Sequence, residues 1–271
     1  MTLFVSDLDG TLIDGKLTIP SDSAAGINAA IARGDGFAAA TARTPATVKE
    51  ILKPIQGALP AIVMNGAGVF DFEKEEYLWL AELSREKAQA VLDTLDSLEM
   101  DGFLYTIHGC AIDVYYRELE NLSQRMFLEA RTGKPYKTFR QGQAPENARR
   151  VFFCIIDSEE RTARLAQALR QIPGLQVFHY RDVHDPENWY VEVYDASCSK
   201  AVGVRFLKER FGFDHVVAFG DNHNDLPLFE AADESYAVAG AVAELKQAAT
   251  GVLSEPDIGA VGRFIGEYAR R

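Results

Sequence analysis

The chain has 271 residues, of which 47% are hydrophobic and 25% are charged, and its formal net charge is −12 at pH 7. This composition indicates a folded globular protein and excludes an intrinsically disordered one. The acidic excess also argues against nucleic acid and anionic membranes as partners, since the basic residues form no patch larger than pairs such as Arg149-Arg150.

The first part of the chain alternates short apolar runs with helical patterns. Strands are expected at 3–5, 37–40 and 61–64, and a hairpin over 69–72 and 77–80. One helix is expected after an N-cap at Ser21-Asp22, and another from Pro45. Such an alternation is typical of βαβ units that build a parallel sheet.

The middle of the chain has a different pattern. Helices are expected at 84–98, 119–130 and 158–171, strands at 103–107, 112–116, 151–156 and 176–180, and a polar loop or extended connection at 132–147. This order predicts an inserted α+β domain with a small sheet of its own.

From Trp189 the first pattern returns. Strands are expected at 190–194, 215–219 and 236–239, with a helix capped by Ser199 and two closing helices. We therefore predict an α/β fold with a Rossmann-like parallel-sheet core at 1–82 and 188–271. An α+β cap domain is predicted to be inserted at 83–187.

The three cysteines, Cys110, Cys154 and Cys198, form no CxxC or Cys/His cluster, so zinc is not expected. Unpaired thiols suit a reducing compartment. The N-terminus has no signal-peptide pattern, and no apolar stretch is long enough to span a bilayer. We expect a cytoplasmic protein with no membrane partner, and the sequence leaves its oligomeric state open.

Two acidic motifs follow predicted core strands. Asp7 and Asp9 lie in Asp-Leu-Asp-Gly-Thr after the first strand, and Asp221 and Asp225 lie in Gly-Asp-Asn-His-Asn-Asp after strand 215–219. Each motif alone could be an acidic turn or a helix cap. Together they would face one crevice at the carboxyl ends of the strands. Four carboxylates there would need a cation, and oxygen ligands beside phosphate chemistry favour Mg²⁺.

Thr41, at the end of the second strand, could donate a hydroxyl hydrogen bond, and Lys200, at the start of a helix, could clamp a phosphate. Read singly, they could equally be a helix cap and a solvated lysine.

Four elements resemble, in chain order, the four motifs of the haloacid dehalogenase superfamily of phosphatases: Asp-Leu-Asp-Gly-Thr at 7–11, Thr41, Lys200 and Gly-Asp-x-x-Asn-Asp at 220–225. The segments Asn65-Gly66-Ala67 and Tyr236-Ala237-Val238-Ala239 are similar to its Cof-type branch, and the position of the insertion is similar to the large cap of its sugar-phosphate phosphatases. The resemblance covers the core; in the middle it rests on the position and length of the insertion.

The resemblance implies a Mg²⁺-dependent phosphatase of small phosphorylated metabolites, with sugar phosphates as the first expectation. Asp7 is then the nucleophile that forms an aspartyl-phosphate, and Asp9 is the general acid and base. The resemblance further assigns phosphate binding and metal binding to sets of residues. Phosphate would be held by Leu8, Thr41, Ala42, Lys200 and Asn224, and Mg²⁺ by Asp7, Asp9 and Asp221, with Asp225 and Asn65 in the outer shell.

One position departs from the branch, which often has glycine where this chain has Ala42. If that glycine serves a positive φ, alanine would strain the turn. Within the predicted cap, the segments 105–116, with His108, and 180–188 contain polar and aromatic groups suited to a sugar. The histidines His108, His179, His184 and His223 are expected to be surface or structural residues.

Three other functions stay open at this point. A phosphomutase of the same superfamily would return the phosphate to a substrate. A glycosyltransferase could use an Asp-x-Asp motif for a nucleotide sugar, but residue 7 is early for that motif and 220–225 would be unexplained. A non-catalytic binding protein would need neither Asp7 nor Asp9.

Overall fold

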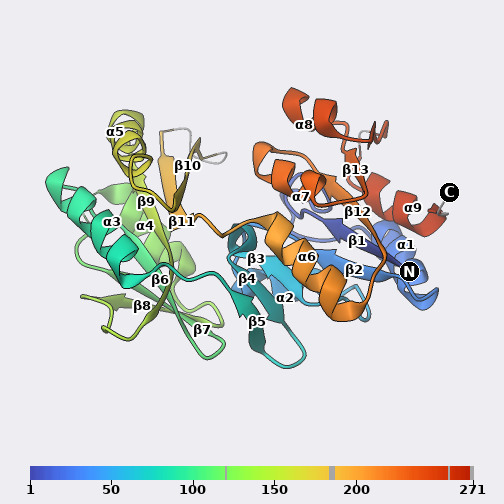
Figure 1. Ribbon diagram of the computed structural model, residues 1–271, viewed down its shortest axis with the longest axis horizontal. Helices are drawn as coiled ribbons and strands as arrows, with labels where there is room; N and C mark the ends of the chain where they lie inside the picture. Colours follow the sequence, from blue (N-terminus) through green and yellow to red (C-terminus); the bar gives the residue numbers. More distant parts are fainter. Residues whose placement is uncertain (120, 183–186, 256, 269–271) are drawn as a thin grey trace. The chain divides into compact units, whose positions relative to one another are not determined.

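The computed structural model describes residues 1–119, 121–182, 187–255 and 257–268 (Figure 1). The chain forms two compact units. Unit 1 combines Met1–Trp79 with Ser199–Arg271, and unit 2 is the continuous segment Leu80–Cys198. No helix within the described ranges has both the length and the apolar character needed to cross a membrane.

Unit 1 is built on a parallel sheet with the strand order β14-β13-β12-β1-β2. The strands are β1 (Thr2–Ser6), β2 (Gly36–Ala39), β12 (His215–Gly220), β13 (Glu234–Ala237) and β14 (Gly251–Val252). The helices are α1 (Ser21–Ala32), α2 (Pro45–Leu52), α6 (Lys200–Phe211), α7 (Leu226–Glu230), α8 (Ala243–Ala248) and α9 (Ala260–Glu267). All five residues of β1 are buried, as expected for a central strand of a covered parallel sheet.

A second, three-stranded sheet in unit 1 has the order β3-β4-β5. Its strands are β3 (Ala61–Val63), β4 (Gly68–Asp71) and β5 (Glu76–Leu80), and β3 continues into the 3₁₀ turn η1 (Met64–Gly66). The predicted strand at 61–64 is therefore present, but it pairs with β4 and touches the parallel sheet through an isolated bridge between Ile62 and Ala40.

Helices α1 and α9 lie side by side in unit 1 (Figure 1), and glycines at their contact allow the two backbones to approach closely. A Cβ atom at Gly26 would lie 2.0 Å from the carbonyl oxygen of Gly262, and one at Gly262 would lie 2.0 Å from Cα of Ser23. Side chains at either glycine would force the helices apart.

Unit 2 contains a six-stranded sheet with the order β10-β11-β9-β6-β7-β8. The strands are β6 (Phe103–His108), β7 (Ala111–Tyr116), β8 (Lys137–Gln141), β9 (Arg149–Asp157), β10 (Leu175–Arg181) and β11 (Trp189–Asp195). The helices are α3 (Arg85–Ser97), α4 (Leu122–Arg131) and α5 (Glu159–Leu169). Neighbouring strands run antiparallel except for β7 and β8, which are parallel.

Helices α3 and α5 cover one face of the unit 2 sheet. Alternate residues of the central strands, including Leu104, Phe153 and Val191, point into the apolar core beneath these helices. The opposite face carries the remaining alternate residues, and α4 places Phe127 against Phe103 there, with ring centroids 4.8 Å apart.

Strand β11 belongs to the sheet of unit 2, so the expected domain boundary at 188 lies too early in the chain. This strand pairs with β10 and β9 in unit 2, and the chain returns to unit 1 at Ser199. Buried Val191 and Val193 alternate with partly exposed Tyr190 and Glu192, which fits an antiparallel strand with two different faces, although Tyr194 is also buried. The core strand β12 is instead almost continuously buried.

Three smaller expectations also differ. Residues 137–141, expected within a polar loop or extended connection, form β8, an edge strand that pairs with β7. The N-cap of α1 is Pro20, without a side-chain capping bond, rather than Ser21. The last predicted strand lies at Glu234–Ala237, two residues earlier than expected, and the two-residue strand β14 follows α8.

We expect Gly26→Ala to destabilise unit 1, because the added methyl group would overlap the backbone of α9. Overpacking of this kind costs about 1–3 kcal/mol. Urea denaturation followed by circular dichroism measures the effect. Gly15→Ala is the matched control, since a Cβ at Gly15 meets no atom within 4 Å. Equal unfolding midpoints for the two variants would contradict the close helix contact.

Candidate active site

Asp7 and Asp221 occupy equivalent places on neighbouring strands. β1 and β12 are parallel and pair Ser6 with Phe219, and each aspartate follows near the carboxyl end of its strand. The Asp7 backbone N–H donates to the Phe219 carbonyl at 3.0 Å, which continues the sheet pairing up to the carboxylates. Strand pairing thus brings together residues that are more than 200 positions apart.

Three carboxylates and one ammonium group form the centre of the site. Oxygen atoms of Asp7, Asp221 and Asp225 all lie within 4.8 Å of one another. The Nζ atom of Lys200 donates to Asp7 at 2.7 Å and to Asp225 at 2.6 Å. Lys200, Asp7 and Asp225 are buried, so these ion pairs are shielded from water.

Burial and mutual repulsion shift the pKa values of these groups. Burial raises the pKa of Asp7 well above its usual value, opposed by the Lys200 ammonium and reinforced by Asp225. Burial alone would lower the pKa of Lys200, but the carboxylates of Asp225 and Asp7 raise it overall, so the amine stays protonated. Burial and then Asp225 raise the pKa of Asp221 to about 6. The three carboxylates therefore carry more negative charge than the single Lys200 ammonium offsets.

Gly10 and Thr11 shape the loop that faces Asp221. Gly10 has a φ of 78°, and a Cβ atom there would lie 2.6 Å from Oδ2 of Asp221. The Thr11 hydroxyl donates to Oδ1 of Asp221 at 3.2 Å. Both the left-handed conformation and the close approach require glycine at position 10.

Asp225 holds the loop after β12. It ends the 3₁₀ turn η2 (His223–Asp225), and its Oδ2 accepts the backbone N–H groups of Asp221 at 3.0 Å and of Asn222 at 3.1 Å. With Lys200 on its other oxygen, Asp225 ties the Asp221 backbone to the buried ammonium.

The turn η1 brings Asn65 and Gly66 to the same site. Asn65 adopts a left-handed conformation with a φ of 55°, and its Oδ1 accepts from Nδ2 of Asn224 at 3.2 Å. A Cβ atom at Gly66 would lie 2.2 Å from the carbonyl carbon of Ser199 and 2.5 Å from the Lys200 nitrogen. The glycine therefore allows the start of α6, and with it Lys200, to lie against this turn.

Thr41 and Ala42 follow β2. Thr41 is buried, and its Oγ1 accepts the N–H of Arg43 at 3.1 Å. Ala42 is exposed and is not among the residues with positive φ, so alanine in place of glycine causes no backbone strain here. Among described residues, the N–H groups of Leu8 and Ala42 donate to no backbone carbonyl.

Asp9 does not join the carboxylate cluster through its side chain. Its carboxylate, 50% exposed, accepts from Nε of Arg43 at 2.7 Å and from Nη2 at 2.6 Å. Sequence reasoning assigned no role to Arg43 or to Thr11. Arg43 directly follows Thr41-Ala42, and Thr11 ends the first acidic motif. Their positions next to the other motif residues could have indicated that they belong to the site.

The side chains at this site fit a hard divalent cation. Asp7 and Asp221 offer carboxylate oxygens, the cluster contains no sulfur or imidazole ligand, and a single ammonium group faces three carboxylates. An all-oxygen donor set is the one that Mg²⁺ prefers.

The candidate sugar-binding residues and the histidines of unit 2 differ in exposure. Tyr105 is buried and His108 is exposed, while Nε2 of His179 lies 3.1 Å from the Thr162 hydroxyl. His184 lies outside the described residues. In unit 1, His223 is exposed.

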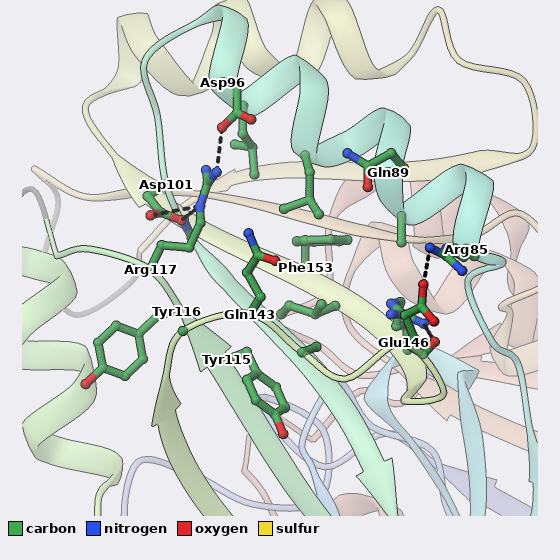
Figure 2. Close-up of a pocket in the computed structure, with 18 residues that line it drawn as sticks. Arg85, Gln89, Asp96, Asp101, Tyr115, Tyr116, Arg117, Gln143, Glu146 and Phe153 are labelled. Atoms are coloured by element: carbon green, nitrogen blue, oxygen red, sulfur yellow. Dashed lines mark hydrogen bonds and ion pairs between the residues drawn. The ribbon is translucent and has the colours of Figure 1, made fainter.

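Figure 2 shows a cavity of about 220 Å³ in unit 2, between α3, β6, β7 and the segment 142–150. Most of its charged groups are paired with one another, while Arg150 donates to backbone carbonyls. Arg117 contacts Asp96 at 2.6 Å and Asp101 at 3.3 Å, and Arg85 contacts Glu146 at 2.6 Å. None of the expected catalytic residues lines it, so it is not the candidate active site.

The sequence profile of the haloacid dehalogenase-like hydrolases matches residues 4–265. The chain belongs to this family, which confirms the resemblance of its motifs. The α/β fold with a parallel-sheet core and an additional sheet domain also agrees with solved structures of the family.

Named relatives cover nearly the whole chain. The pyridoxal phosphate phosphatase YbhA of Escherichia coli is 24% identical, with 96% of this chain and 95% of the relative aligned. A 5-amino-6-(5-phospho-D-ribitylamino)uracil phosphatase of Bacillus subtilis, YitU, is 23% identical over 98% of this chain and 97% of its own length.

Two solved structures share the fold at low identity. A Thermotoga maritima protein is 23% identical with a TM-score of 0.78, covering 99% of this chain and 98% of its own. A sugar phosphatase of subclass IIB in the same superfamily is 20% identical with a TM-score of 0.75, covering 97% of each chain.

We expect Lys200→Met to destabilise unit 1 strongly, because Asp7 and Asp225 would stay buried without their cation. Removing one partner of a buried ion pair costs about 3–5 kcal/mol. Thermal unfolding in EDTA measures the loss. Lys208→Met is the control, because Lys208 pairs with Asp233 near the surface, where a pair contributes about 1 kcal/mol or less. Similar unfolding temperatures for both variants would refute the buried-pair argument.

Proposed function

We propose that this protein is a Mg²⁺-dependent phosphatase that hydrolyses phosphomonoesters of small metabolites through an aspartyl-phosphate. The observation that carries the proposal is the cluster of buried Asp7 and Lys200 with partly buried Asp221, at the carboxyl ends of β1 and β12. Membership of a hydrolase family, and relatives that are named phosphatases, support the same reaction class.

Asp7 is the proposed nucleophile. Its carboxylate attacks phosphorus, the bond from phosphorus to the ester oxygen breaks, and the phosphoryl group is transferred to the aspartate. Lys200 lies 2.7 Å from this carboxylate, so its ammonium is placed to offset negative charge that arrives with the substrate.

The equatorial phosphoryl oxygens need hydrogen-bond donors. We assign this role to the Thr41 hydroxyl, the Lys200 ammonium, the Asn224 amide and the backbone N–H groups of Leu8 and Ala42. The contact between Asn224 and Asn65 would hold the Asn224 amide in position, so Asn65 acts from the outer shell. A single donor of this kind typically lowers the barrier by about 3 kcal/mol.

The Asp7 and Asp221 carboxylates and the Asp9 backbone carbonyl would hold Mg²⁺. When bound, the ion supplies positive charge that stabilises the phosphoryl oxygens. Asp225 would not contact the ion directly, because its oxygens already accept from Lys200, Asp221 and Asn222. Its role is to orient the Asp221 loop.

Asp9 is the proposed general acid and base. It would protonate the leaving oxygen, and then take a proton from the water that hydrolyses the aspartyl-phosphate. In this structure both Asp9 oxygens are bound by Arg43, so the ion pair must open before the carboxylic acid can donate.

For the substrate we infer a small phosphorylated metabolite. The names of the relatives point to phosphorylated heterocycles, and one solved structure with this fold is a sugar phosphatase. Sugar phosphates remain our first expectation, with unit 2 as the proposed substrate-specificity domain. A panel of sugar phosphates, pyridoxal 5′-phosphate and nucleotides would identify the preferred class.

The nucleophile is tested with Asp7→Asn, which keeps the shape of the side chain but removes its charge. We expect phosphate release from p-nitrophenyl phosphate with Mg²⁺ to fall by at least about 10³-fold. Asp14→Asn, at an exposed aspartate, should retain wild-type activity. Equal rates for Asp7→Asn and wild type would rule out Asp7. Release of one phosphate for each alcohol would indicate a phosphatase, because a phosphomutase returns the phosphoryl group to a substrate.

The metal site has a readout that does not need turnover. We expect Mg²⁺ to raise the thermal unfolding temperature of the wild type above its value in EDTA, since a ligand that binds the native state stabilises it. Asp221→Asn should lose most of this increase, and Asp14→Asn should keep it. An unfolding temperature that does not respond to Mg²⁺ in the wild type would contradict the assignment.

A further inference from the structure

The face of the unit 2 sheet opposite α3 and α5 is lined with aromatic rings. Tyr105 stacks on Phe152 with ring centroids 4.1 Å apart, and Phe152 stacks on Tyr194 at 4.8 Å. At the other end of this face Tyr180 stacks on Tyr190 at 5.5 Å, with the rings 5° from parallel. Tyr180 is 42% exposed, so part of this aromatic surface is open to solvent.

Two cationic side chains lie on this aromatic face. Arg131, the last residue of α4, places its guanidinium carbon 3.8 Å from the ring centroid of Phe127. Lys137, the first residue of β8, places Nζ 5.1 Å from the ring centroid of Tyr105. Both side chains are partly buried.

Neither cation forms an ion pair with a carboxylate in the described ranges, although the chain is acidic. With 40 acidic and 28 basic residues, carboxylates are in surplus. The guanidinium groups of Arg117 and Arg85, at the cavity of Figure 2, each have a carboxylate partner. Arg131 and Lys137 differ from these two arginines, since each lies over an aromatic ring and has no carboxylate partner in the described ranges.

The titratable groups around the two cations are Tyr105, Cys154 and Tyr190. Two acids, Asp182 and Glu192, lie beside those groups. The Glu192 carboxylate already accepts from the Tyr194 hydroxyl at 3.0 Å, and a further hydrogen bond joins it to Tyr180. Burial keeps the Cys154 thiol protonated by raising its pKa. Within the described residues, none of these neighbours forms an ion pair with Arg131 or Lys137.

The pKa of Lys137 reflects these surroundings. Burial, and next the positive charge of Arg131, lower the pKa of Lys137 to about 8. Two like charges on a partly desolvated surface repel each other, and a bound anion would remove that cost. Arginine beside lysine is a pairing suited to carboxylate and phosphate groups.

We propose that Arg131 and Lys137 form an anion-binding subsite of unit 2. It takes the carboxylate or phosphate group of a small organic molecule whose flat body packs on the rings of Tyr180 and Tyr190. The Phe127 ring beneath Arg131 lies 6.4 Å from the Tyr190 ring between centroids, which places the cation and the stacked rings in one neighbourhood. The anion can be part of the phosphorylated substrate or a separate metabolite, since both have the same chemistry.

Benzoate tests the subsite directly, with benzamide as its uncharged counterpart. In the full chain labelled with ¹³C at lysine Cε, we expect benzoate to shift the Lys137 resonance and to raise its pKa above about 8. Benzamide should do neither. Lys137→Met and Arg131→Met should each weaken benzoate binding by at least about tenfold, as expected for loss of a charged hydrogen bond.

Two further variants control for structural effects. Lys134→Met removes an exposed lysine three residues away and should leave benzoate binding unchanged. Lys137→Arg keeps the charge and should retain binding within about threefold, which is less than a single charged hydrogen bond. Equal affinity for benzoate and benzamide in the wild type would overturn the proposal. So would a Lys137→Met variant that folds and binds benzoate as the wild type does.

Steady-state kinetics distinguishes an anion that is part of the substrate from one that belongs to a separate metabolite. This experiment rests on the proposed phosphatase activity. If the subsite binds substrate, Lys137→Met raises KM for 4-carboxyphenyl phosphate about tenfold and leaves p-nitrophenyl phosphate unchanged. If it binds a separate metabolite, Lys137→Met leaves both KM values unchanged while benzoate binding is still lost. A wild type that binds benzoate but releases no phosphate would refute the proposed function and not the subsite.

Discussion

The ammonium group of Lys200 lies between two buried carboxylates that come from opposite ends of the sequence. Asp7 extends from the first strand, Asp225 from the turn after β12, and Lys200 from the first turn of α6. Removing Lys200 would leave two buried carboxylates without their cation, which the interior of a protein tolerates poorly. The contact therefore joins both segments of unit 1, and fixes the carboxylate edge on which the proposed chemistry depends.

Much of unit 1 could be predicted because its motifs encode their own local geometry. An apolar run followed by Asp-x-Asp-Gly predicts a buried strand that ends at a carboxylate, and Ser199 before Lys200 predicts a capped helix start. The structure contains both features, with the Ser199 hydroxyl accepting the N–H of Ala201. What the sequence could not supply was the assignment of β11 to a sheet, because alternating residues fit any half-buried strand. β8 was not identified as a strand because its residues are mostly polar and it gains its hydrogen bonds from β7 at a sheet edge.

The convergence of Asp7, Lys200, Asp221 and Asp225 follows from sequence order once strands β1 and β12 are known to be parallel neighbours. The pairing of Arg43 with Asp9 does not, because a long side chain can reach several acids and its choice depends on the turn after β2. The left-handed backbone of Asn65 is another case. Asparagine tolerates this conformation, but its presence here depends on contacts with residues from both segments of unit 1.

The interrupted layout of unit 1 bears on how the chain is made. Unit 2 is one continuous stretch, so it has all of its strands as soon as residue 198 has left the ribosome. β1 is synthesised first, yet its partner β12 begins at His215 and α9, which packs on α1, at Ala260. Until then the apolar edge of β1 and the glycine surface of α1 have no covering. The N-terminal segment of unit 1 must therefore avoid aggregation during most of translation. Unit 2 is synthesised after this segment but can complete its fold before it.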